Sequence, residues 1–311
     1  MNVHRLAANV AIRAPAKLNL FCEILAKRGD GYHEIETLMV SVSLFDTLLA
    51  APETTDAIRV DCRWAAAPSD GDSLGHLPSA EKNLAFRAVA LLRSRAGLRQ
   101  GISLQIIKRI PAEAGLGGAS SDAAAALLAA NAVWNLNWSR EQLAQVAGEL
   151  GSDIPFFVGQ SGSSGLVDAP ASAAVCRGRG EQVEGVFGLV PLYFVIVRPP
   201  VGLSTAEVYR HCQAATEPRA LSPLLEALVS GDQRQLGRLI HNRLQPAAES
   251  LSPWIGRLKR EFAKEDCLAS QMSGSGTSYF GICRHARHAR RVARRLRSRG
   301  LGRVFAVSTC R

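Results

Sequence analysis

The feature that most constrains this chain is a glycine-rich stretch joined directly to an alanine-rich run, PAEAGLGGASSDAAAALLAAN, from Pro111 to Asn131. The segment before it, GISLQIIKRI, predicts a strand that ends at Pro111. The alanine-rich run predicts a helix, because alanine is the strongest helix former. A strand, a flexible turn and a helix therefore follow one another here.

This order of elements is suited to holding phosphate. A helix N-terminus leaves backbone N–H groups unpaired and carries partial positive charge, and glycines let the backbone approach an anion closely. Ser120 and Ser121 can cap the helix or contact a phosphate or Mg²⁺. No lysine follows the glycines, which excludes a Walker loop, and Ser120 replaces the third glycine of a dinucleotide fingerprint. From these residues alone, a purely structural glycine turn remains an open alternative.

Composition indicates an ordinary globular protein of one or two domains, with 311 residues, 47% hydrophobic and 21% charged. The sequence lacks an apolar run long enough to cross a membrane and an N-terminal secretory signal, so we expect a cytoplasmic protein without membrane contact. The seven cysteines are scattered and form no C-x-x-C pair, which favours reduced thiols over a zinc site or disulfides.

The formal net charge of +10 invites an anionic partner, and much of it lies in RHARHARRVARRLRSRG, residues 284–300. Within this segment Ala289, Val292, Ala293 and Leu296 fall at helical spacing. We therefore predict an amphipathic helix with a solvated arginine face. An RNA-binding surface is the alternative, although few aromatic residues lie nearby to stack bases.

The order of the remaining patterns predicts an α+β protein with two lobes, over residues 1–166 and 167–311. The opening third predicts strands, and a helix follows that stops at Gly97. Ser139 and Gln142 predict a capping box for a helix that Gly151 ends. The second half predicts helices near 223–240 and 252–264, a strand SYFGIC, the arginine helix and a last strand RVFAVST.

Four motifs together resemble the GHMP kinase superfamily. P-x-x-x-G-L-G-G-A-S-S-D-A-A resembles its phosphate loop and MSGSGTSYF its third glycine motif. APAKLNLFCEILAKRGDGYHEIETLMVSVSLFDTL and LGSDIPFFV resemble the family that acts on cytidine diphosphate-linked methylerythritol. The resemblance spans Ala14 to Phe280. It implies an N-terminal lobe like domain 2 of ribosomal protein S5, a ferredoxin-like C-terminal lobe, and ATP-dependent phosphorylation of the substrate 2-hydroxyl in the non-mevalonate isoprenoid pathway.

The resemblance implies a catalytic pair, Lys17 and Asp153. A lysine in mid-strand is unusual unless it reaches a partner, and an ammonium beside Asp153 would stabilise the transferring phosphoryl group. Asp153 would be the general base, and a helix N-cap before Pro155 is its structural alternative. The structural alternative for Lys17 is a strand-edge lysine that reaches water.

For the substrate, the resemblance implies contacts from Asn19, Tyr32, His33, Thr205 and Tyr209. Tyr32 and Tyr209 would stack on the cytosine, and His33 would hydrogen-bond it. Asn19 lies two residues from Lys17, hence on the same strand face.

ATP, with Mg²⁺, would bind at Pro111, Gly115, Leu116, Gly117, Gly118, Ala119, Ser120, Ser121, Asn83 and Lys108. A helix cap for Asn83 and a strand-end charge for Lys108 are alternatives, and the role of Asp122 stays open. Ala119 replaces a glycine of the family pattern, which is tolerable unless that residue needs a positive φ. We expect no metal site built by the protein itself.

Two alternatives to this function remain: a homoserine- or mevalonate-type GHMP kinase, and an RNA-binding protein. The segment KRGDGYHEIET favours a kinase with a pyrimidine substrate over a homoserine- or mevalonate-type kinase. The expected partner is a small molecule rather than nucleic acid, and the expected assembly is a monomer or weak homodimer. Residues 161–172 look like an insertion relative to the family.

Overall fold

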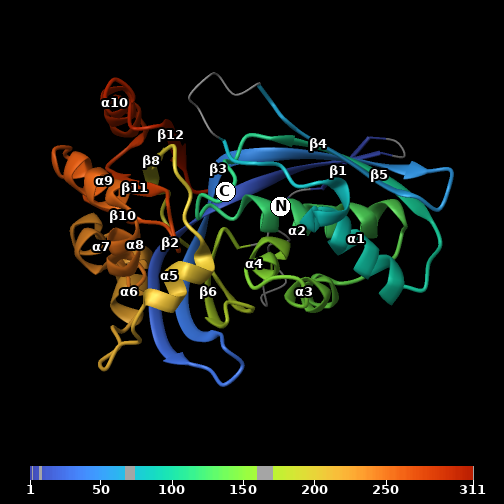
Figure 1. Cartoon of the computed structure of the whole chain (residues 1–311), viewed down its shortest axis with the longest axis horizontal. Coiled ribbons are helices and arrows are strands. Elements are labelled where there is room, and N and C mark those ends of the chain that lie inside the picture. Colours follow the sequence, from blue (N-terminus) through green and yellow to red (C-terminus); the bar gives the residue numbers. More distant parts are fainter. Residues whose placement is uncertain (2, 7–8, 67–73, 160–170, 311) are drawn as a thin grey trace.

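The computed structural model describes residues 1, 3–6, 9–66, 74–159 and 171–310, and the description below concerns these residues. Two sheets with helices packed on them form two lobes (Figure 1). The first sheet contains β1 (Val3–Leu6), β2 (Asn9–Lys27), β3 (His33–Glu53), β4 (Ile58–Trp64), β5 (Gly101–Lys108), β6 (Ala173–Gly178), β7 (Gln182–Val186) and β9 (His241–Asn242). The second contains β8 (Tyr193–Arg198), β10 (Ala269–Met272), β11 (Tyr279–Cys283) and β12 (Arg303–Ser308).

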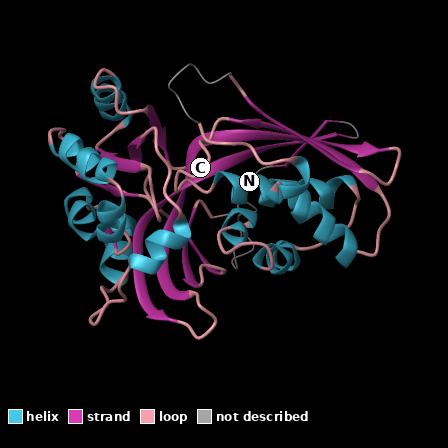
Figure 2. Ribbon diagram, in the orientation of Figure 1, coloured by secondary structure: helices cyan, strands magenta, loops and turns pink. Residues whose placement is uncertain are grey.

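Strands β2 and β3 connect the two lobes. They pair antiparallel over most of their length, and both reach from the helices of the first lobe to those of the second (Figure 2). Strand β3 changes its second partner on the way: residues 47–53 pair with β5, and residues 35–40 pair with β6. The middle of each strand is buried on both faces, so a polar side chain there needs a partner.

The first lobe carries η1 (Ala80–Lys82), α1 (Leu84–Arg95), α2 (Gly118–Val133), α3 (Arg140–Gly148) and α4 (Ile154–Val158), which cover one face of the first sheet (Figure 2). Helix α2 packs against α1, α3, α4 and β2. Residues 123–130, six of them alanine, are all buried. Small side chains allow this close packing on every side, which explains the alanine-rich run.

Helix ends in the first lobe follow the sequence signals, with one exception. Ser139 and Gln142 form the predicted capping box, and Gly97 follows α1 with a φ of +64°, as predicted for a glycine after a helix end. The prediction that Gly151 ends α3 was wrong, since the helix ends at Gly148. Residues 149–153 instead form a short turn between α3 and α4, and the N–H of Gly151 donates to the Ala147 carbonyl across it (3.2 Å).

The second lobe packs helices on an antiparallel sheet in the order β10-β11-β8-β12. Its helices are α5 (Thr205–His211), α6 (Ser222–Ser230), α7 (Gln233–Leu239), α8 (Gln245–Leu251), α9 (Pro253–Ala263) and α10 (Ala286–Arg297). The α+β prediction is confirmed. The expected boundary between residues 166 and 167 lies outside the described residues. The chain leaves the first sheet after Val186 and returns to it for β9.

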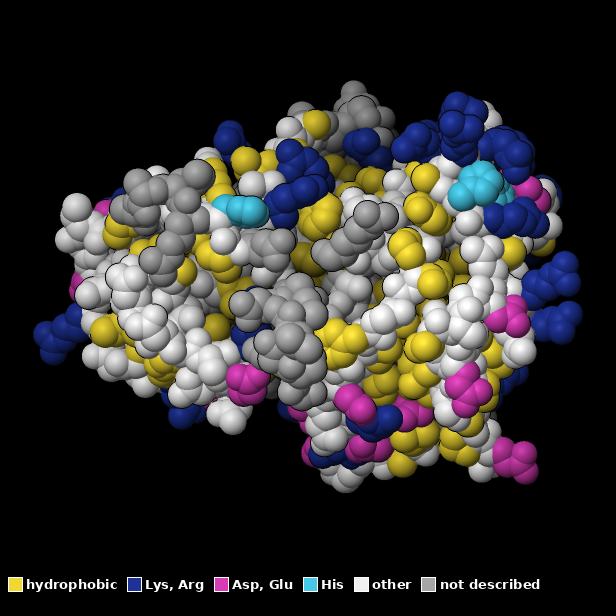
Figure 3. Space-filling model, turned by 180° about the vertical axis from the view of Figure 1, so that it is seen from behind, with side chains coloured by type: hydrophobic (Ala, Val, Ile, Leu, Met, Phe, Trp, Pro, Cys, Tyr) yellow, Lys and Arg dark blue, Asp and Glu magenta, His cyan; other side chains and the backbone are white. Residues whose placement is uncertain are grey.

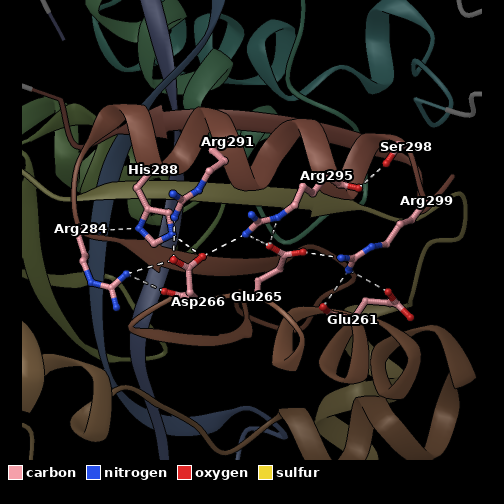
Figure 4. Close-up of polar contacts among 9 residues, drawn as sticks. All are labelled: Glu261, Glu265, Asp266, Arg284, His288, Arg291, Arg295, Ser298 and Arg299. Carbon is pink, nitrogen blue, oxygen red and sulfur yellow. Dashed lines mark hydrogen bonds and ion pairs between the residues drawn. The ribbon is translucent and has the colours of Figure 1, made fainter.

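The arginine-rich helix α10 is amphipathic as predicted, with Ala289, Val292, Ala293 and Leu296 buried. On one side its arginines reach acidic residues that end and follow α9 (Figure 4). Arg295 and Arg299 both contact the buried Glu265, at 2.5 and 2.6 Å.

Asp266 extends this network and accepts from His288 (3.0 Å) and Arg291 (2.7 Å). Other arginines gather on the surface over α10 (Figure 3, upper right). Arg291, Arg295 and Arg299 therefore fix α10 to its own lobe. Within the described part of the chain, no helix combines the length and apolarity needed to cross a membrane.

Candidate active site

A cavity of about 1180 Å³ runs between the glycine-rich loop and the tip of the β2–β3 hairpin. Its walls come from both lobes, because Gly274, Ser275 and α5 complete a surface that is otherwise built by the first lobe. Among its lining residues are Lys17, Asn19, Tyr32, His33, Asn83, Lys108, Pro111, Gly115, Gly117, Gly118, Ala119, Ser120, Asp153, Thr205 and Tyr209. The structure thus brings most of the predicted site residues to one cavity.

The glycine-rich loop packs tightly on β2 at the start of α2. The backbone N–H of Lys17 donates to the Leu116 carbonyl (2.9 Å), which ties the loop to the strand. Gly117 precedes α2 with a φ of +71°, and a Cβ there would lie 2.9 Å from both Lys17 Cγ and Phe157 Cζ. Only glycine therefore fits at this position. Ala119 lies inside the helix, so its methyl group is accommodated.

A second loop, residues 273–278, joins the glycine-rich loop from the other lobe. Ser273 donates its hydroxyl hydrogen to the Gly115 carbonyl (3.1 Å), and the N–H of Ser278 donates to the Ala114 carbonyl (3.1 Å). These bonds hold the third glycine motif against the phosphate-loop candidate. The N-terminus of α2 opens beside them, where Gly118, Ala119 and Ser120 line the cavity.

Lys17 and Asp153 form an ion pair in the cavity wall. Lys17 lies in mid-strand and is 5% exposed, and its Nζ lies 3.6 Å from Asp153 Oδ2. Asp153 stands at the N-cap position of α4, but its side chain makes no capping hydrogen bond. The carboxylate is one-third exposed (34%) and faces the cavity. Its side chain therefore does not take the structural role that was the alternative.

Asn19 holds the Lys17 ammonium in place. Its Oδ1 accepts from Lys17 Nζ (2.5 Å), and its Nδ2 donates to Thr37 Oγ1 (2.8 Å). Thr37 in turn donates to the Phe21 carbonyl (2.6 Å). Both ends of the Asn19 amide are engaged inside the protein, an orienting role that the sequence reasoning did not foresee.

A buried cluster of three charges lies beside the glycine-rich loop. The Lys108 ammonium contacts Asp46 and Asp122, the latter at 2.5 Å. Burial alone would lower the pKa of Lys108, but the two carboxylates raise it above its ordinary value. Burial raises the pKa of Asp122 to about 7, opposed by Lys108 and supported by Asp46. Asp122 therefore has a charged partner inside the protein.

Asp46 was missed by the sequence reasoning. It also accepts hydrogen bonds from the backbone N–H groups of Arg109 and Ile110, the latter at 2.9 Å, so it fixes the chain just before the glycine-rich loop. The available signal was a single carboxylate inside the apolar strand pattern SLFDTLLA.

The other residues that were predicted to bind ATP differ in where they lie. Asn83 caps α1, with its Oδ1 accepting from the Ala85 N–H (2.9 Å). Leu116 is buried in the core and Ser121 is buried within α2, so neither side chain lines the cavity. Pro111 lines the cavity at the entrance to the loop.

The opposite end of the cavity is aromatic. Tyr32 is 56% exposed near the tip of the β2–β3 hairpin, and the His33 and Tyr209 rings lie 5.3 Å apart between centroids. Burial lowers the pKa of His33, with Lys27 adding to the effect, which keeps the ring neutral near pH 7. Thr205 exchanges a hydrogen bond with Ser275 (2.9 Å) at the start of α5.

Comparison with known proteins gives this cavity its context. Residues 83–174 match the GHMP kinases N terminal domain, and residues 224–301 match the GHMP kinases C terminal domain. A 4-diphosphocytidyl-2-C-methyl-D-erythritol kinase of Pelotomaculum thermopropionicum is 38% identical over 91% of this chain and 92% of its own length. The kinase of the same name from Syntrophotalea carbinolica is 37% identical, covering 94% and 96%.

Solved structures agree with this relationship. A crystal structure of 4-(cytidine 5'-diphospho)-2C-methyl-D-erythritol kinase superposes with a TM-score of 0.75 and 32% identity, covering 96% of this chain and 98% of that one. A homoserine kinase from Cytophaga hutchinsonii has a TM-score of 0.70 at 20% identity, covering 100% and 97%, and shares the fold.

Proposed function

Since this chain belongs to the 4-diphosphocytidyl-2-C-methyl-D-erythritol kinases of the GHMP superfamily, we propose that its cavity holds ATP and the substrate end to end. The substrate, 4-diphosphocytidyl-2-C-methyl-D-erythritol, is called the cytidyl alcohol below. Lys17 and Asp153 lie where the two molecules meet. The enzyme is a phosphotransferase of the methylerythritol phosphate route to isoprenoids. The observation that carries the proposed roles is the Lys17–Asp153 pair, 3.6 Å apart between the glycine-rich loop and the aromatic end.

Transfer of the γ-phosphoryl group requires a positioned hydroxyl, a proton acceptor and stabilisation of charge. Asp153 accepts the proton of the substrate 2-hydroxyl, for which its partly exposed carboxylate is accessible. The Lys17 ammonium, oriented by Asn19, stabilises the developing alkoxide and the transferring phosphoryl group.

The glycine-rich loop binds the ATP phosphates through backbone N–H groups at the start of α2. Gly115, Gly117, Gly118 and Ala119 lie at the cavity there, and Ser120 adds a hydroxyl group. Asn83 and Lys108 lie along the wall next to this loop, where the nucleoside would extend.

The residues at the start of α2 fit a Mg²⁺ ion that accompanies ATP. Asp122 Oδ1 is a buried oxygen without a hydrogen-bond partner among the described residues, and the Ser120 hydroxyl lines the same wall. Mg²⁺ binds oxygen ligands and takes few of them from protein when phosphates supply the rest. The ion would supply charge neutralisation at the phosphates when bound, and Ser120 and Asp122 would hold it.

The aromatic end suits the cytosine of the substrate. Tyr32 presents an exposed ring for stacking, Tyr209 lies behind the neutral His33, and Thr205 borders the same space. The proposal also includes a monomer or weak homodimer acting in the cytoplasm.

The test is to measure ADP release with the cytidyl alcohol, homoserine and mevalonate in parallel. We expect turnover with the cytidyl alcohol alone. Turnover with homoserine or mevalonate, and none with the cytidyl alcohol, would contradict the proposal.

A further inference from the structure

The turn between β6 and β7 brings an arginine to the cavity that none of the motifs includes. Arg179 lies in this turn, is one-third exposed, and lines the cavity. Its guanidinium carbon lies 5.0 Å from the centroid of the Tyr32 ring, a cation–π contact. The substrate-side aromatic and a cation therefore meet although they come from different hairpins.

The turn is anchored on both sides of Arg179. The Arg179 N–H donates to Glu181 Oε2 (2.7 Å), while the Nε atom of its side chain lies farther from that carboxylate, at 3.8 Å. At Gly180 the turn packs on Ser152, where an added Cβ would lie 3.4 Å from the Ser152 Cβ. Ser152 directly precedes Asp153. The anchored turn thus places Arg179 between Tyr32 and the Asp153 segment.

Charge at this end of the cavity favours an anion. The cations Lys27, Arg179 and Arg210 are among the cavity-lining residues, and the acidic ones are Glu113, Asp122 and Asp153. Asp122 is paired with Lys108 (2.5 Å) beside the glycine-rich loop. Lys27 and Arg210 are exposed, whereas Arg179 is held against Tyr32. A guanidinium can bind a diphosphate through two parallel hydrogen bonds, which makes Arg179 the best placed of the three.

We infer that Arg179 binds the diphosphate that links cytidine to the alcohol, while its guanidinium also packs on the Tyr32 ring. The inference rests on the proposed function, because that function puts cytosine at Tyr32 and the reacting hydroxyl at Asp153. The diphosphate lies between these two parts of the substrate. Arg179 is then a specificity residue that selects a cytidine diphosphate over an uncharged nucleoside.

The test compares the wild type with Arg179→Ala and Arg179→Lys. Loss of charge-assisted hydrogen bonds should raise the KM for the cytidyl alcohol about 10- to 100-fold in Arg179→Ala, with the KM for ATP unchanged. Arg179→Lys should lie between, since lysine keeps the charge and loses the bidentate geometry. CDP and cytidine serve as competitive inhibitors, and only CDP should bind more weakly to Arg179→Ala.

Arg177→Ala is the matched control. Arg177 belongs to the same hairpin, pairs with Glu36 (3.0 Å) and Glu184 (2.8 Å), and does not line the cavity. The KM of Arg177→Ala for the cytidyl alcohol should stay at the wild-type value. Melting temperatures equal to that of the wild type would show that both alanine variants fold. An unchanged KM in Arg179→Ala, or equal losses of CDP and cytidine affinity, would overturn the inference. An inactive wild-type enzyme would instead overturn the proposed function.

Discussion

Replacing Gly117 with alanine should damage stability and catalysis together. An alanine at a φ of +71° costs about 1–2 kcal/mol of folding free energy. The new Cβ would also lie 2.9 Å from Lys17 Cγ and Phe157 Cζ, and such overpacking costs about 1–3 kcal/mol more. Because Lys17 is one of the two crowded residues, its ammonium should shift away from Asp153, and kcat should fall roughly 100-fold.

Gly97→Ala separates the two costs. Gly97 has nearly the same backbone conformation, with a φ of +64°, but no atom lies within 4 Å of a Cβ added there. Urea unfolding should therefore show a loss of about 1–2 kcal/mol for Gly97→Ala and a further ~1–3 kcal/mol for Gly117→Ala. Steady-state kinetics should leave Gly97→Ala at the wild-type kcat. Equal stabilities for the two variants, or full activity of Gly117→Ala, would refute the reasoning.

Four further predictions concern other parts of the molecule. Asp153→Asn should retain ATP binding, measured by calorimetry, and lose at least about 100-fold in kcat; full activity would remove Asp153 from the reaction. Tyr32→Ala should raise the KM for the cytidyl alcohol far more than that for ATP, whereas equal effects would contradict cytosine stacking. Lys108→Met leaves two buried carboxylates without their cation, so urea unfolding should show a loss of roughly 3–5 kcal/mol, and a loss under ~1 kcal/mol would count against the charge cluster. Burial would raise the pKa of Asp266, but His288 and Arg291 lower it to about 2. The stabilising contribution of Asp266 is then present above pH 3.8 and is lost as the pH falls toward 2. Asp266→Asn should weaken this acid dependence in thermal melts.

Local structure was largely predictable because short-range signals decide it. The Ser139–Gln142 capping box, the glycine after α1 and the apolar face of α10 each depend on residues within a turn or two of one another. The prediction that Gly151 ends α3 was wrong because a glycine after a helix can equally belong to the following turn.

The two lobes were predictable from element order, whereas strand pairing was not. The pairing of β6 with β3 joins residues more than 130 positions apart, and nothing local in the sequence specifies it. That long-range pairing places β6 and β7 in the first sheet.

The proximity of Lys17 and Asp153 was predictable from the resemblance, but the hydrogen bonds that hold Lys17 in place were not. The predicted substrate contact of Asn19 stays a prediction, and its hydrogen bond to Lys17 was not foreseen. Asp46 and Arg179 were missed because each contacts a residue that is distant in sequence. Asp46 contacts Lys108, and Arg179 contacts Tyr32.

Because β2 carries Lys17 and continues into the turn that holds Tyr32, a fixed number of residues connects the middle of the cavity to its aromatic end. Side chains alternate along a strand, so deleting one residue from β2 would reverse the facing of every residue beyond it and draw the hairpin tip back by about 3.3 Å. We therefore expect this stretch of chain to tolerate changes of residue type during evolution more readily than insertions or deletions.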